Sequence, residues 1–76
     1  MAKKKTSAKD IISLGKHIAK ERQKRGISLE TLATDMDISK GNLSDIENGK
    51  RDPRFSTLKA IANGMDLDVS ELLKNY

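Results

Sequence analysis

Residues 28–54 read SLETLATDMDISKGNLSDIENGKRDPR. Apolar residues recur at helical spacing in both halves of this stretch, namely Leu29, Leu32, Ala33 and Met36 and then Leu43 and Ile46. Ser28 and Ser39 precede the two patterns, where serine is favoured as the N-cap of a helix. The sequence therefore predicts one helix over 28–36 and a second over 39–48, each burying one face and presenting the other.

A sharp turn precedes the second of these helices and a basic loop follows it. Only Asp37 and Ile38 separate the two helices, which is too short for anything but a sharp turn. The second helix is predicted to end at Asn48-Gly49, a left-handed C-cap signal. Positively charged residues come directly after it, namely Lys50, Arg51 and Arg54. A loop of this kind suits contact with phosphate groups.

The same helical spacing predicts three further helices. Their expected bounds are 10–25, with Asp10 as N-cap and Gly26 as the end, 56–63, with a C-cap signal at Asn63-Gly64, and a short last helix that starts at Asp68 or Ser70. No stretch shows the apolar alternation of a strand. The predicted fold class is all-α with five helices.

The length and composition allow one small domain. The chain has 76 residues, of which 36% are hydrophobic and 34% charged. No apolar run approaches the roughly 20 residues needed to span a membrane. The chain has no Cys, which excludes disulfides and thiolate metal sites, and its basic start lacks the apolar segment of a secretory signal. A cytoplasmic protein is the expectation.

The formal net charge of +4 is unevenly distributed. Residues 1–26 carry nine Lys or Arg against two acids, whereas residues 27–49 carry one Lys against five acids. Residues 1–9, MAKKKTSAK, are polar and lack periodicity, so we expect a flexible basic arm there and a folded domain over 10–76. Positive groups therefore bracket the two-helix stretch, which is itself acidic.

The run from Leu14 to Leu73 resembles the phage-repressor-like helix-turn-helix family, also called the XRE family. The resemblance is carried by Arg22, by Gly26-Ile27-Ser28, by Leu32-Ala33, by the string Leu43-Ser44-Asp45-Ile46-Glu47-Asn48-Gly49-Lys50, and by Pro53-Arg54. It implies a five-helix domain, similar to lambda repressor, that binds double-stranded DNA as a homodimer. In this family the third helix lies in the major groove, and the half-sites of an inverted repeat are about one turn apart.

The resemblance also implies a role for individual residues. The positions nearest base edges are Lys40, Gly41, Ser44 and Asp45. The positions that contact the DNA backbone are Ser39, Asn48, Lys50, Arg51 and Arg54. Arg22 and Glu47 match a structural salt bridge between the first and third helices. In some phage repressors a lysine-rich arm wraps along the duplex, and Lys3, Lys4 and Lys5 are the matching residues here.

Three positions depart from the family pattern. Leu29 stands where many members have a Gln that bonds a phosphate. Asp37 stands where Gly is usual in the turn, and Asp tolerates a left-handed backbone better than most residues. Asp45 stands where a basic or amide residue is common. An acid that faces DNA either accepts a hydrogen bond from a base or indicates that this helix binds a protein. The alternative function is therefore a protein-interaction module of the same fold, such as an antitoxin or adaptor.

The surface for a two-fold contact is predicted near the C-terminus. The apolar residues there exceed what one short helix needs for its own packing: Leu67, Leu72, Leu73 and Tyr76. The alternative is that Leu72 and Leu73 cover the first helix. Both interpretations remain open from the sequence.

The residues give no indication of catalysis, of a metal or of a cofactor. His17 is the only histidine and is interpreted as an ordinary helix residue. The series from Asp35 to Ile46 resembles the start of a calcium loop, but Lys40 falls where the loop glycine belongs and Ile46 where the closing Glu belongs. The five glycines are interpreted as caps or turns. No enzymatic activity, cofactor, metal or small-molecule ligand is expected.

Overall fold

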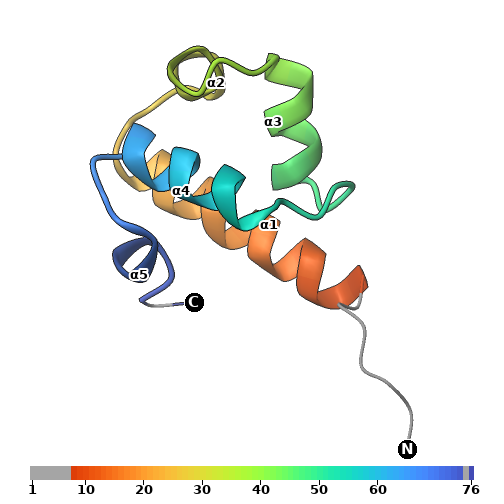
Figure 1. Cartoon of the computed structure of the whole chain (residues 1–76). Helices are drawn as coiled ribbons and strands as arrows, with labels where there is room; N and C mark the ends of the chain where they lie inside the picture. Colours follow the sequence, from red (N-terminus) through yellow and green to blue (C-terminus); the bar gives the residue numbers. More distant parts are fainter. Residues whose placement is uncertain (1–7, 75) are drawn as a thin grey trace, which may run out of the picture.

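The computed structural model describes residues 8–74 and residue 76 (Figure 1). Five helices follow one another: α1 (Ala8–Lys24), α2 (Leu29–Asp35), α3 (Lys40–Glu47), α4 (Phe55–Gly64) and α5 (Val69–Leu72). No strand occurs in the described residues. The all-α fold with five helices is therefore confirmed. The predicted arm lies largely outside the described residues, although its last two residues, Ala8 and Lys9, belong to α1.

Side-chain caps start three of the helices. The Ser28 hydroxyl accepts a hydrogen bond from the Thr31 backbone N–H, and the Ser39 hydroxyl accepts one from Asn42 in the same way. Both predicted N-caps are confirmed. Asp68, rather than Ser70, caps α5 in a reciprocal capping box. Each cap satisfies backbone donors that a helix start leaves without partners.

The predicted N-cap at Asp10 is wrong. Helix α1 begins two residues earlier, at Ala8, and Asp10 lies within its first turn. A carboxylate there is still favourable, because the first turn carries the positive end of the helix dipole. Helix α4 likewise begins one residue earlier than predicted, at Phe55, and its N-cap Arg54 supplies no side-chain hydrogen bond.

The interpretation of all glycines as caps or turns is correct only in part. Gly26 and Gly49 have positive φ, at 68° and 75°, and end α1 and α3. Gly64 lies inside α4, and the left-handed position after that helix is Asp66, with φ of 62°. Packing favours glycine at this position, because a Cβ at Gly64 would overlap the Leu32 side chain. Gly15 is also helical, where α1 meets α3.

The α2–α3 pair packs on α1 and α4, and the core lies between them (Figure 1). Six side chains are fully buried there: Ile18, Leu32, Leu43, Ile46, Ile61 and Leu72. The turn between α2 and α3 contains Asp37, which has φ of 58°. This left-handed residue turns the chain so that α3 crosses α1 with its apolar face inward.

The buried His17 joins the C-terminal end of the chain to α1. Its Nε2–H donates to the Leu72 carbonyl oxygen at 2.7 Å, and its ring lies 5.2 Å from the Tyr76 ring. The expectation of an ordinary helix residue missed this contact. Among the described residues, no group of three His, Cys, Asp or Glu side chains is placed to hold a metal ion. No helix in the same part of the chain is long and apolar enough to cross a membrane.

Candidate nucleic-acid interface

Helix α3 buries one face and leaves the other free. Leu43 and Ile46 point into the core, whereas Lys40 and Gly41 are exposed in the first turn. Ser44 and Asp45, one turn further along, are half-buried. The spacing of these outward residues places them on one face of the helix. Four residues predicted to lie near base edges are therefore brought together: Lys40, Gly41, Ser44 and Asp45.

The orientation of α3 is fixed by a buried ion pair. Arg22 of α1 donates two hydrogen bonds to the Glu47 carboxylate, from Nε at 2.7 Å and from Nη2 at 2.9 Å. Its third group, Nη1, donates to the Ile27 carbonyl oxygen at 2.8 Å. The hydrogen bonds to Glu47 raise the pKa of Arg22 above its ordinary value. The expected pair thus ties α3 to α1 and to the start of the α2 segment.

A second charged cluster supports the end of α1. The Arg25 guanidinium donates to the Glu21 carboxylate at 2.8 Å, and Lys24 lies 3.3 Å from the same group. The hydrogen bond from Arg25 is the main reason that the pKa of Glu21 is lowered, against the opposing effect of its burial. This cluster uses two of the basic residues of α1 inside the domain.

Polar contacts order the outer face of α3. The Asn48 amide donates to the Ser44 hydroxyl at 3.1 Å. The Arg51 guanidinium lies 3.9 Å from the Asp45 carboxylate, and the two side chains are 57% and 43% exposed. A pair this exposed contributes little to stability, but it offsets the negative charge that Asp45 would otherwise present. Ser39 acts as the cap of α3.

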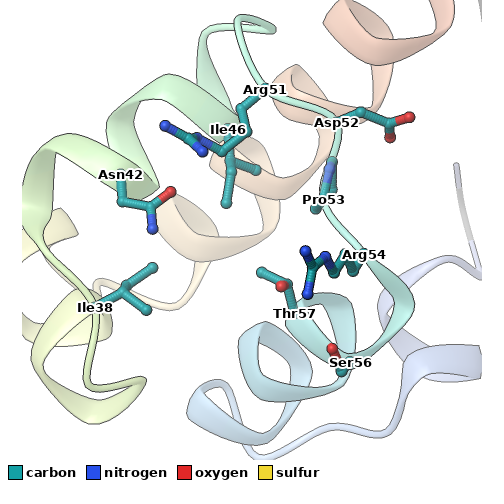
Figure 2. Close-up of a pocket in the computed structure, with 9 residues that line it drawn as sticks. All are labelled: Ile38, Asn42, Ile46, Arg51, Asp52, Pro53, Arg54, Ser56 and Thr57. Atoms are coloured by element: carbon teal, nitrogen blue, oxygen red, sulfur yellow. The ribbon is translucent and has the colours of Figure 1, made fainter.

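A cleft of about 270 Å³ separates α3 from the start of α4. Figure 2 shows the Arg54 guanidinium turned into this cleft, Arg51 at its rim, and the Asp52 carboxylate turned away from it. Ser56 and Thr57, in the first turn of α4, also line it. Two guanidinium groups beside a helix N-terminus favour an anion.

The C-terminal residues predicted for a two-fold contact divide into two kinds. Leu72 is fully buried in the core of the single chain, so its side chain is not on the surface. Leu67 and Leu73 are half-buried against the same core, and Tyr76 is 56% exposed. Sequence reasoning missed Phe55, which at 65% is the most exposed large apolar residue among those the structure describes. The predicted helix begins at Ser56, one residue after Phe55, so it does not include Phe55 among the residues of α4.

Helices α2 and α3 are joined by a short sharp turn, and the polar face of α3 is exposed. This arrangement defines a helix-turn-helix domain of the transcriptional-regulator type. The chain belongs to the HTH_3 helix-turn-helix family, whose family model matches residues 18–72.

Curated relatives and solved structures are similar to this chain. The HTH-type transcriptional regulator DdrOP3 of Deinococcus deserti is 38% identical over 53 residues, which cover 70% of this chain and 41% of that protein. The control protein C.MunI of a Mycoplasma species is 34% identical over 65 residues, with 84% and 88% covered. The restriction-modification controller protein C.AhdI of Aeromonas hydrophila superposes with a TM-score of 0.79 at 25% identity, covering 84% and 97%. The chain thus spans less than half of DdrOP3 but most of the two controllers.

Proposed function

We propose that this chain is a sequence-specific transcriptional regulator that binds double-stranded DNA as a homodimer, with α3 in the major groove of an inverted repeat. The observation that carries the proposal is the free polar face of α3 beside the basic cleft at the start of α4. The relatives named as regulators and controllers support the same function.

The outward residues of α3 supply both donors and acceptors for base edges. The exposed Lys40 ammonium donates hydrogen bonds, which suits guanine O6 and N7. The Asp45 carboxylate accepts, which suits the amine of cytosine. Because Arg51 lies close to Asp45, this acid approaches DNA with part of its charge offset. That proximity reduces the repulsion from phosphates that would otherwise favour the interaction-module alternative.

The cleft is the proposed anchor for the DNA backbone. Arg54 and the first turn of α4 face the same space, and a phosphate group placed there would meet a guanidinium and a helix N-terminus. Lys50 and Arg51 extend the positive charge along the loop that precedes it. These contacts position the protein on the duplex without reading sequence. The arm residues Lys3, Lys4 and Lys5 lie outside the described residues and are proposed only as an additional phosphate contact.

Selection of bound duplexes from a random DNA pool, at near-physiological salt, tests the proposed function. We expect the purified chain to enrich an inverted repeat, because two copies related by a two-fold axis read the same half-site in opposite directions. A folded protein that enriches no sequence would overturn the proposal and favour the protein-interaction module.

Alanine substitutions at Lys40 and at Arg51 are expected to impair DNA binding in different ways. Lys40→Ala should reduce discrimination at one base pair by about 1–3 kcal/mol. Arg51→Ala should weaken binding to all sequences alike and lower the slope of log affinity against log salt by about 0.9. Binding titrations on the operator and its single-base variants, at two salt concentrations, measure both effects. Lys59→Ala, an exposed change on α4, is the control. An identical uniform loss for Lys40→Ala and Arg51→Ala would show that the assignment of readers is wrong.

The homodimer is proposed to form through apolar surface that the single chain leaves uncovered. Phe55 and Tyr76 are the most exposed large apolar residues in the described part of the chain, at 65% and 56%. Leu67 and Leu73, which lie near Tyr76 in the sequence, are half-buried and add partly exposed apolar side chains. Exposed aromatic side chains are typical of the centres of protein interfaces.

Phe55→Glu is expected to convert a dimer into a folded monomer. The Phe55 side chain is exposed and is not part of the hydrophobic core, so its replacement should not unfold the chain. Sedimentation or light scattering gives the oligomeric state, and circular dichroism gives the fold. Ile12→Glu, at a residue 42% exposed on α1, is the matched control and should leave the dimer intact. Leu73→Glu should also give a folded monomer if Leu73 contacts the second copy. A dimer that survives both Phe55→Glu and Leu73→Glu would place the contact elsewhere.

A further inference from the structure

One of the five glycines has no structural reason to be glycine. Gly26 and Gly49 have positive φ, and Gly15 and Gly64 lie against neighbours that a Cβ would overlap. Gly41 has neither property. Its φ is outside the left-handed region, and a Cβ placed on it would meet no atom within 4 Å.

Gly41 therefore lowers the stability of the domain, and no close packing at this position compensates for the loss. Glycine lowers the stability of a helix relative to alanine, since it loses more backbone freedom on folding. Gly41 lies in the first turn of α3, a helix of only eight residues, in which such a loss matters. A glycine that lowers helix stability and meets no neighbour in its own chain leaves room for close approach by another molecule.

The position of Gly41 makes that approach specific. Ser44, Asp45 and Asn48 follow it by three, four and seven residues, so all four lie on the outer face of α3. Contacts hold the three side chains in place: Asn48 donates to Ser44, and Asp45 lies near Arg51. At Gly41 this face has only bare backbone. A Cβ placed there would meet only open space, so a group of a bound molecule can approach the backbone directly.

We propose that Gly41 is a specificity-determining residue whose bare backbone receives the C5-methyl group of a thymine. The inference rests on the proposed function and specifies one base that the site reads. The methyl group of thymine is the apolar projection that bases present in the major groove. Because Gly41 has no Cβ, α3 can approach the base edge closely. The methyl group then contacts the Gly41 Cα and is shielded from water. An alanine side chain would occupy the same space.

Replacing thymine by deoxyuridine tests this contact, because the substitution removes only the methyl group. On the operator obtained by pool selection, the wild-type chain should lose roughly three- to fivefold in affinity at one thymine per half-site, the value of one buried methyl group. Gly41→Ala should bind the thymine operator roughly tenfold more weakly. The same variant should be insensitive to deoxyuridine at that position.

Stability separates this effect from damage to the fold. Gly41→Ala is expected to raise the midpoint of thermal unfolding by about 2–6 °C, because alanine favours the helix and meets no neighbour. Ser13→Ala, an exposed change on α1, is the matched control. It should raise the midpoint slightly and leave DNA binding unchanged.

Three results would overturn the proposal. The first is a Gly41→Ala variant that binds both operators as the wild-type chain does, and the second is a preferred half-site whose thymines all tolerate deoxyuridine. Either leaves the proposed function intact. The third is failure of the wild-type chain to enrich any duplex, which overturns the proposed function together with this inference.

Discussion

Replacing Gly15 with alanine is expected to lower the free energy of unfolding by about 3 kcal/mol, at the upper end of the cost of overpacking. A Cβ at Gly15 would overlap the Ile46 carbonyl oxygen and lie 2.7 Å from that of Glu47. Both oxygens belong to the backbone of α3, so no side-chain rotation relieves the overlap. Helix α3 must move away from α1 instead. For a domain of this size, the midpoint of thermal unfolding should fall by roughly 12–24 °C.

The same substitution at two other glycines provides a graded comparison. Gly64→Ala would overlap a side-chain atom of Leu32, which has some freedom to rotate, so the loss should be smaller than at Gly15. The new methyl group of Gly41→Ala meets no neighbour, so this substitution should be stabilising. Thermal and urea unfolding of the three variants give the order directly. Equal effects at Gly15 and Gly41 would show that close contact between α1 and α3 is not what requires glycine.

Features that depend on neighbours in the sequence could be predicted from it. The N-caps at Ser28 and Ser39 join residues only three positions apart, and the apolar periodicity of each helix is equally local. The left-handed backbone at Asp37 follows from the shortness of the turn, because the chain must change direction sharply between the two helices. The five helices and their order could therefore be derived without knowing how they pack.

Features that depend on packing could not be derived in this way. Gly64 carries the same Asn-Gly signal as Gly49, yet it is still helical, as the last residue of α4, and it packs against Leu32. His17 and the Leu72 carbonyl are 55 residues apart, and nothing in the sequence connects them. The Leu72 side chain is likewise buried in the core, away from the surface for which it was predicted.

The candidate site also has some features that follow from the local sequence and others that depend on packing. The outer face of α3 follows from helical spacing, and the family resemblance indicated its use. The proximity of Asp45 to Arg51 was not predicted, because it depends on the path of the loop after Gly49. The sequence suggested separate roles for these two residues, one near the bases and one at the backbone. Their closeness now means that substitutions at either residue should be interpreted together.

Removing the Glu47 carboxylate is expected to cost about 3–5 kcal/mol, because it leaves the Arg22 guanidinium buried without its partner. The side chains of Arg22 and Glu47 are only 10% and 8% exposed, and the pair makes two short hydrogen bonds. A chain of 76 residues has a total stability of roughly 4–11 kcal/mol at typical values per residue. Glu47→Ala should therefore leave the domain marginally folded.

The exposed pair of Asp45 and Arg51 provides the control for this prediction. Asp45→Ala should change the free energy of unfolding by less than about 1 kcal/mol, and salt should reduce even that difference. The effect of Glu47→Ala should persist at high salt, because solvent ions do not reach the buried pair. Urea unfolding at low and high salt compares the two. A loss at Glu47 no larger than that at Asp45 would mean that α3 keeps its orientation through Leu43 and Ile46 alone. In that case Glu47→Ala should also bind DNA normally, whereas a displaced α3 should weaken binding to every sequence.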